Sequence, residues 1–261
     1  MWACTTFAAL NPNGDALLGR NFDWHNRPSL LLFTDPPDGY ASASMVDISY
    51  LGFGSGVPDE AQLENLLEAP YWPFDGMNEA GLAVGMMAVP HAEGGSDPQK
   101  ATLDSLLVIR LLLDYAANVD EAIALLEEVN VDFGGGPPLH YLIADSSGQA
   151  AVIEFIDGEM VLLRNEEPWQ VSTNVVISEV PEDERIAAGH RYQVVTEALE
   201  RTEGLVGRAE AMTLLSEVAN NGSSYPTMWS VVYNMSTGGI QVVVGRQYDT
   251  AYEFRLDILA E

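Results

Sequence analysis

The order of strand-like and helix-like segments most constrains how this chain can fold. Short apolar and β-branched runs bounded by turn signals predict antiparallel strands near both ends and in the middle of the 261-residue sequence. Two pairs of segments with helical spacing of apolar residues interrupt them, at 102–117 with 120–129 and at 184–200 with 208–220. This block arrangement predicts an α+β fold in which two sheets pack together under outer helices. No linker or repeat divides the sequence, so we expect one domain over 1–261.

The first two predicted strands form a hairpin around the only cysteine, Cys4. "CTTFAAL" begins at Cys4, Asn13 and Gly14 supply the turn, and "ALLGRNFDW" returns as the second strand. Further strands are expected in "SMVDISYLGF", in "GLAVGMMAV", in three segments of "LHYLIADSSGQAAVIEFIDGEMVLLRN", in "WQVSTN", in the hairpin "MWSVVYNMSTGGIQVVVG" and in "AYEFRLDIL". Between them, the Asp-Gly pair at 75–76 favours a turn ahead of Asn78.

Acidic residues dominate the charge of the chain, with 39 Asp and Glu against 11 Lys and Arg and a formal net charge of −28. A polyanion needs a basic face, so nucleic acid is excluded as a partner. The longest apolar run, "LLVIRLLLDYAA", is too short to span a membrane, and no signal-peptide pattern is visible. The chain as written is therefore expected in the cytoplasm, or outside it if a leader has been removed. The scattered histidines show no metal spacing, so neither a metal nor a cofactor is expected.

The single thiol allows two interpretations. A lone cysteine is often a small buried apolar residue. If the Ala3–Cys4 peptide bond were cut, however, Cys4 would carry a thiol and a free α-amine, with ordinary pKa values of about 8.5 and about 8. Such a residue combines a nucleophile with its own base and needs no separate histidine.

Four segments occur in order along the chain: "CTTFAAL" with "GRNFDW", then "FDGMNEAGLAVGMM", "VSTN" and "HRY". In these segments and their order the sequence resembles the choloylglycine hydrolase and penicillin V acylase family of N-terminal-nucleophile hydrolases, to which acid-ceramidase-like amidases are related. The resemblance implies the αββα sandwich of N-terminal-nucleophile hydrolases. It also implies hydrolysis of a linear, non-peptide C–N amide bond through an acyl-thioester intermediate. Residues 1–3 would then be a short propeptide whose removal, by autoproteolysis or a protease, exposes Cys4.

The resemblance also implies roles for individual residues. Cys4 would attack the amide carbonyl, Arg20 would favour its thiolate, and Asp23 would orient the α-ammonium group. Asn174 would donate a hydrogen bond to the oxyanion.

Two further residues complete the implied catalytic set. Asn78 would complete the oxyanion hole by its side chain or backbone, and Arg191 would close the polar network by holding Asp23 or the acyl oxygen. Arg185 is the alternative to Arg191. Arg191 comes only seventeen positions after Asn174, so the insertion with which bile-salt-type members build tetramers is absent, and a homo-oligomer is left open.

Apolar residues near these positions suggest the substrate. Trp24, Trp72, Met86 and Met87 are candidates for binding an apolar acyl group, or else belong to the core. The charge of −28 disfavours anionic substrates and favours a neutral N-acyl amide as the small-molecule partner. Three alternatives remain: acyl transfer, a Cys-His thiol hydrolase with His25 as base, and an inactive relative that binds acylated ligands.

Overall fold

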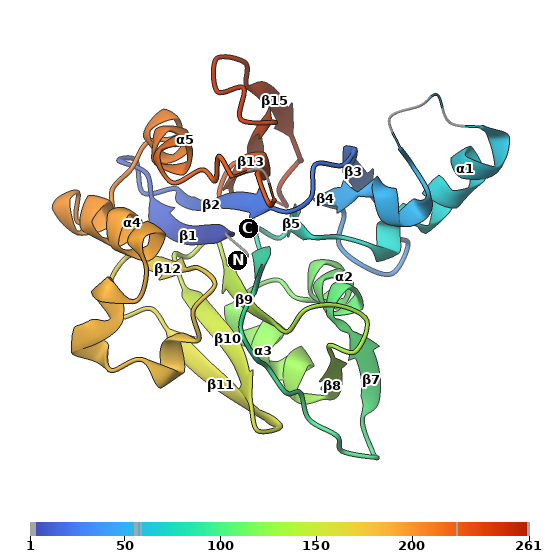
Figure 1. Cartoon of the computed structure of the whole chain (residues 1–261), viewed down its shortest axis with the longest axis horizontal. Coiled ribbons are helices and arrows are strands. Elements are labelled where there is room, and N and C mark those ends of the chain that lie inside the picture. Colours follow the sequence, from blue (N-terminus) through green and yellow to red (C-terminus); the bar gives the residue numbers. More distant parts are fainter. Residues whose placement is uncertain (1–3, 55–56, 58, 223, 260–261) are drawn as a thin grey trace.

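The structure is a computed structural model that describes residues 4–54, 57, 59–222 and 224–259. These residues form two antiparallel sheets packed face to face, with helices on the outer side of each (Figure 1). In order across it, the first sheet contains β12 (Gln170–Ser172), β1 (Thr5–Leu10), β2 (Ala16–Asp23), β13 (Thr227–Asn234), β14 (Gly239–Val244) and β15 (Tyr252–Arg255). The second contains β11 (Glu159–Arg164), β10 (Ala150–Ile156), β9 (Leu139–Ala144), β6 (Ala83–Ala88), β5 (Asp75–Asn78), β4 (Ser42–Asp47) and β3 (Ser29–Thr34).

Helices cover both outer faces. On the first sheet, α4 (His190–Arg201) packs against β1 and β12, and α5 (Arg208–Glu217) against β2 and β13. On the second, α2 (Ser105–Tyr115) packs against β5 and β6, and α3 (Val119–Glu127) against β9. The remaining elements are α1 (Glu60–Asn65), the short parallel pair β7 (Ala101–Asp104) and β8 (Val129–Asp132), and 3-10 helices at Ile48–Leu51, Leu66–Tyr71, Ile177–Glu179 and Glu182–Ala187. The predicted α+β architecture with outer helices is confirmed.

Packing between β1 and β2 depends on a glycine. Gly19 lies opposite Phe7, and a β-carbon on Gly19 would come within 2.5 Å of the Phe7 ring. The ring therefore occupies the space that any other side chain would need. Phe7 belongs to a hydrophobic cluster that takes residues from both sheets and from the helices over them.

The structure differs from the sequence prediction in several elements, and β3 was not predicted. Residues 75–78 form strand β5 instead of a turn, because Asp75 finds buried partners across the sheets. Residues 102–104 belong to β7, and the helix begins after Asp104, whose carboxylate accepts hydrogen bonds from the next backbone N–H groups. Residues 182–187 form a separate 3-10 helix, because extended Gly189 precedes α4. No helix in the described part of the chain has the length and apolar character needed to cross a membrane.

Candidate active site

Cys4 lies immediately before β1, beside the end of β2. The antiparallel pairing puts Thr5 opposite Asn21, so the residue before β1 meets the last residues of β2. The Asp23 backbone N–H donates to Cys4 Sγ at 3.5 Å, and the thiol donates to the Asp23 carbonyl oxygen at 3.8 Å. Cys4 is only 3% exposed. The register of one hairpin therefore joins the two residues.

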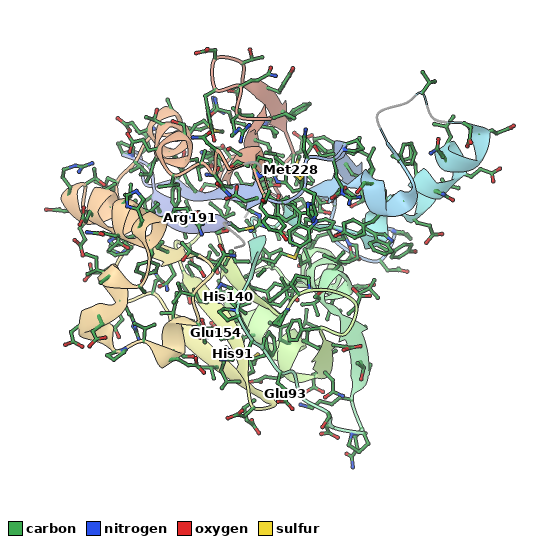
Figure 2. All side chains as sticks on the ribbon, in the orientation of Figure 1. His91, Glu93, His140, Glu154, Arg191 and Met228 are labelled. Atoms are coloured by element: carbon green, nitrogen blue, oxygen red, sulfur yellow. The ribbon has the colours of Figure 1, made fainter. Side chains whose placement is uncertain are left out.

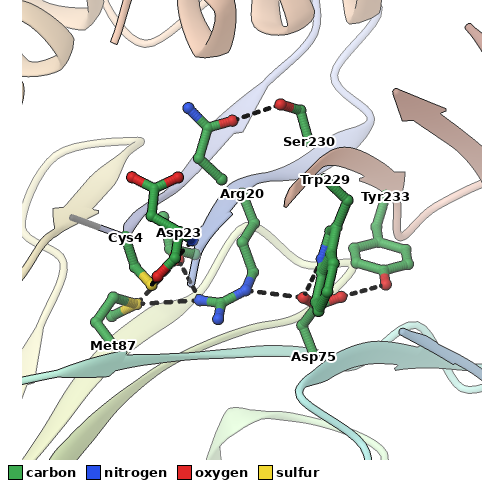
Figure 3. A network of polar contacts seen from close by, with 10 residues as sticks. Cys4, Arg20, Asp23, Asp75, Met87, Trp229, Ser230 and Tyr233 are labelled. Carbon is green, nitrogen blue, oxygen red and sulfur yellow. Dashed lines mark hydrogen bonds and ion pairs between the residues drawn. The ribbon is translucent and has the colours of Figure 1, made fainter. Parts of the chain in front are cut away.

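Arg20 points from β2 into the space between the sheets, where it is fully buried (Figure 3). Thr6 lies directly opposite it on β1 and shares that face. Arg20 Nε donates to Asp75 Oδ2 at 2.8 Å, and Nη1 donates to Thr6 Oγ1 at 3.1 Å and to Met87 Sδ at 3.4 Å. Among the described residues, Nη2 has no hydrogen-bond partner. The site thus contains a fixed positive charge held by the second sheet.

Asp75 completes this buried ion pair and was missed by the sequence analysis. Its Oδ2 also accepts a hydrogen bond from Trp229 Nε1 at 2.9 Å, and its Oδ1 accepts one from the Tyr233 hydroxyl at 2.7 Å. Burial raises the pKa of Asp75, whereas the Arg20 charge and these donors oppose that rise. The one signal for a buried charge was an acidic residue between apolar ones. The Asp-Gly pair at this point favours a turn, so the signal was interpreted as a turn.

Asp23 is fully buried at the end of β2. Its Oδ1 accepts a hydrogen bond from Thr227 Oγ1 at 2.5 Å, whereas Oδ2 has no partner among the described residues. Burial raises the pKa of Asp23 to about 7, although the Thr227 hydrogen bond and the charge of Arg191 act in the opposite direction. A buried carboxylate oxygen is therefore left available for a donor next to Cys4.

Arg191 connects the start of β1 to the loop that contains Asn174. From the first turn of α4, its Nη1 donates to the Cys4 carbonyl oxygen and, at 2.8 Å, to Thr5 Oγ1. Its Nη2 donates to Asn174 Oδ1 at 2.8 Å, so the amide nitrogen of Asn174 faces away and donates to the Ala88 carbonyl at 2.6 Å. The guanidinium group therefore fixes the orientation of this amide.

Arg185 and Arg191 were alternative candidates for the same role, and their positions in the structure distinguish them. Arg185 Nε donates to the Val180 carbonyl at 3.4 Å, whereas Arg191 contacts the residues around Cys4.

Asn78 does not lie at the candidate site. Asp75 faces the space between the sheets, and strand alternation turns Asn78 toward α2. Its amide nitrogen donates to the Leu113 and Ala116 carbonyls at 3.0 and 2.8 Å. The prediction of an oxyanion donor from the Asn78 side chain is corrected: this side chain completes the C-terminal end of α2.

A cavity of about 710 Å³ opens beside Cys4 and Asp23. Of the four predicted substrate contacts, Trp24, Trp72 and Met86 line it, whereas Met87 does not. Met87 is fully buried and accepts the hydrogen bonds of Thr6 and Arg20 between the sheets, so its assignment to the substrate site is corrected. Other lining residues are Phe22, Tyr50, Tyr71, Phe74, Ala88, Asp104, Ser105, Leu106, Leu107, Asp132, Gly135, Gly136, Pro137 and Leu139. The described lining is largely apolar and contains neither lysine nor arginine.

The electrostatics of the thiol reflect this setting. Burial raises the pKa of Cys4, and the charge of Arg20 is the largest influence in the opposite direction. A thiol facing a cavity with two guanidinium groups nearby can serve attack on a carbonyl carbon. Asn174 is not among the described residues that line this cavity, and its amide nitrogen donates to the Ala88 carbonyl. No cluster of three or more His, Cys, Asp or Glu side chains suited to a metal occurs among residues 4–54, 57, 59–222 and 224–259.

Comparisons with known proteins agree with this fold. The chain is 28% identical over 188 residues to penicillin V acylase from Pectobacterium atrosepticum, a match of 66% of this chain and 49% of that protein. The chain thus spans about half the length of that curated relative. A variant of conjugated bile acid hydrolase from Clostridium perfringens superposes with a TM-score of 0.72 at 15% identity, covering 97% of this chain and 92% of the other. Penicillin V acylase from Agrobacterium tumefaciens gives 0.69 at 19% identity, with 97% and 87% coverage.

These likenesses confirm the expected αββα sandwich of N-terminal-nucleophile hydrolases and the resemblance found in the sequence. The model of the family described as acyl-coenzyme A:6-aminopenicillanic acid acyl-transferase matches residues 73–249. Because this match covers more than half of the sequence, the chain belongs to that family.

Proposed function

We propose that this chain hydrolyses linear N-acyl amides with Cys4, freed as an N-terminal residue, as its nucleophile. The observation that carries the proposal is the position of Cys4 and Asp23 side by side on the wall of a largely apolar cavity. Family membership and the likeness to a penicillin V acylase support an amide as substrate.

The proposed reaction proceeds in two steps. The α-amine of Cys4 takes the thiol proton, and sulfur attacks the amide carbon while the carbonyl electrons move to oxygen. Asn174 Nδ2 donates to this oxyanion. As the C–N bond breaks, the leaving nitrogen takes the proton from the α-ammonium group, and the acyl group stays on sulfur as a thioester. Water, deprotonated by the same amine, then releases the acid and restores the thiol.

Asp23 would serve this cycle through its second oxygen. Oδ1 is occupied by Thr227, whereas the buried Oδ2 has no partner among the described residues. An α-ammonium group on Cys4 would donate to Oδ2 and hold the amine next to sulfur. This contact would also lower the pKa of Asp23, because a nearby positive charge stabilises the carboxylate.

A neutral acyl amide suits the cavity better than an anion. Its described lining supplies aromatic and aliphatic surface for an acyl chain and no cationic side chain, and besides Asp23 it contains the carboxylates Asp104 and Asp132. Those carboxylates and the net charge of −28 would repel a carboxylate or sulfonate substrate. We therefore propose fatty acyl ethanolamides, N-acyl homoserine lactones or ceramide-like lipids as the substrate class.

The Cys-His alternative receives less support. His25 is exposed, and its ring packs against those of Trp24 and Tyr225, with ring centroids 5.4 and 4.9 Å apart. The sulfur of Cys4 instead forms hydrogen bonds with the Asp23 backbone. The predicted propeptide, residues 1–3, lies outside the described residues, so its removal is part of the proposal.

Intact mass and acyl-enzyme trapping test the proposal together. Active protein should begin at Cys4, and denaturing it during turnover should reveal the mass of one acyl group. Cys4→Ala should show neither turnover nor adduct, while Cys4→Ser should turn over far more slowly because an alcohol is a much weaker acid than a thiol. Active protein that still begins at Met1 would support the Cys-His alternative. Full-length protein without activity would support an inactive ligand-binding relative, and formation of a new amide from an added amine would support acyl transfer.

A further inference from the structure

A buried histidine and glutamate connect the two sheets next to the candidate site. His140 on β9 and Glu154 on β10 are 1% and 2% exposed, and His140 Nδ1 lies 3.1 Å from Glu154 Oε1. Figure 2 shows the two side chains close together below Arg191. Neither residue contributes to the proposed chemistry, so the pair needs a separate explanation.

The hydrogen bonds of this pair reach the chain on both sides of Asn174. Before it, His140 Nε2 lies 2.7 Å from the Thr173 carbonyl oxygen and 3.1 Å from Ser172 Oγ. After it, the backbone N–H groups of Ile177 and Ser178 donate to the two oxygens of Glu154 at 2.7 and 2.9 Å. The loop that contains Asn174 is thus attached at both ends to the opposite sheet.

The partners of the pair favour the ionised form of Glu154. Both of its oxygens accept backbone hydrogen bonds, which stabilise the carboxylate. Each ring nitrogen of His140 faces an oxygen, Nδ1 that of Glu154 and Nε2 that of the Thr173 carbonyl. Burial alone would raise the pKa of Glu154, but the hydrogen bonds from His140 and Ser178 outweigh burial and lower it. The contacts are therefore charge-assisted and stronger than those between neutral groups.

We propose that His140 and Glu154 are positioning residues for the Asn174 amide. Arg191 fixes the rotation of this amide, whereas the His140–Glu154 pair fixes the backbone on which it stands. An oxyanion donor misplaced by about 1 Å costs roughly 10²-fold in rate, so a fixed loop matters for turnover. This inference rests on the proposed function, because its kinetic effect passes through Asn174.

A double-mutant cycle tests the coupling. Glu154→Gln should lower kcat by roughly 10- to 10²-fold and change KM by less than about 3-fold, because the donor acts mainly in the transition state. In an Asn174→Ala background the same substitution should cost less than about 3-fold, since the group that it positions is already gone. Multiplicative losses in the double variant would overturn the proposal.

The matched control is the exposed pair His91–Glu179, joined at 2.9 Å, whose glutamate belongs to the same loop region. His91→Gln should leave kcat unchanged. An equal loss of kcat in this variant would overturn the specific role of the buried pair.

Hydrogen exchange separates this inference from the proposed function. In Glu154→Gln, the amides of Ile177 and Ser178 should exchange at least about 10-fold faster, while those of β1 keep their protection. Unchanged exchange at 177–178 would overturn the inference whether or not the protein turns over. Absence of Cys4-dependent turnover in the wild type would contradict the proposed function, and the exchange result would still decide whether the pair holds the loop.

Discussion

Two asparagines should respond to substitution in opposite ways. Asn174→Ala should lower kcat by roughly 10²-fold or more, the scale for one oxyanion donor, while the melting temperature stays nearly constant. Asn78→Ala should leave the Leu113 and Ala116 carbonyls without their donor and lower the free energy of unfolding by about 1–3 kcal/mol, with kcat of the folded protein unchanged. Steady-state kinetics and thermal unfolding of both variants check this. A loss of rate explained by unfolding of Asn174→Ala would contradict its role.

Asp23 should make the precursor less stable as pH rises. Its pKa of about 7 in the folded protein lies above the ordinary value of about 3.9. Between these values the folded protein holds a proton that the unfolded chain has lost, so stability falls from about pH 4 to about pH 7 and is level above. At about 1.4 kcal/mol per unit, the loss is at most about 4 kcal/mol.

Denaturant unfolding of the chain that retains residues 1–3 measures this effect. Relative to the wild type, Asp23→Asn should gain stability as pH rises from about 4 to about 7, because it removes the titrating group. The exposed control Asp249→Asn should follow the wild-type profile. A parallel profile for Asp23→Asn would mean that Asp23 does not titrate in this range. In the matured protein an α-ammonium group should remove most of the effect.

The charge of Arg20 should set the pH at which Cys4 reacts. Removing Arg20 alone leaves Asp75 buried without its partner and endangers the fold. The variant Arg20→Met with Asp75→Asn removes the pair and should shift alkylation of Cys4 by iodoacetamide to higher pH. Asp75→Asn alone should shift it to lower pH, because Arg20 then acts without the opposing charge. Identical profiles in all three proteins would exclude Arg20 from the electrostatics of the thiol.

Site residues could be predicted from the sequence where they lie close together along the chain. Cys4, Arg20 and Asp23 share one hairpin, so register alone predicts that they meet. Asp75 and His140 act through partners on other strands, and no local sequence pattern predicts such contacts.

The secondary-structure elements show the same limit. The hairpin of β1 and β2 follows from alternation and a turn, whereas β3 has intermediate to exposed residues and was missed. In β5 the Asp-Gly pair favours a turn locally, but the buried contacts of Asp75 with Arg20, Trp229 and Tyr233 favour a strand. Tertiary contacts override local propensity where a charged residue is buried among partners.

Strand β6 should tolerate no side chain at its closest approach to the site. A β-carbon on Gly85 would lie 3.1 Å from the Thr6 methyl and 3.2 Å from Arg20 Cδ and Nη1. Gly85→Ala should therefore displace the buried guanidinium, costing about 1–3 kcal/mol of stability and shifting the alkylation profile of Cys4. Gly54→Ala, whose new methyl would meet no atom of the described residues within 4 Å, is the control. Wild-type stability and alkylation in Gly85→Ala would show that the sheets can separate without cost.

For the whole molecule, packing explains the fold, whereas charge leads to an expectation about substrates. The hydrophobic cluster that joins both sheets accounts for the sandwich. Three statements stay predictions: that the chain is one domain, that a homo-oligomer is possible, and that a tetramer-building insertion is absent.

The net charge of −28 should discriminate between substrates in a salt-dependent way. The screening length falls from about 30 Å at 0.01 M salt to about 3 Å at 1 M, so repulsion of an anion weakens as salt is added. The kcat/KM for penicillin V and for a glycine-conjugated bile acid should rise severalfold over this range, whereas that for a fatty acyl ethanolamide should change less than about 2-fold.

Asp104→Asn with Asp132→Asn separates the cavity's own charge from that of the whole molecule, because asparagine can still cap α2. If the local carboxylates cause most of the repulsion, this variant should lose most of the salt dependence with anionic substrates. If the net charge of the molecule causes it, the variant should keep the salt dependence. Anionic substrates cleaved at least as efficiently as neutral ones at low salt would contradict the charge argument. The substrate would then be sought among carboxylates such as penicillins and conjugated bile acids.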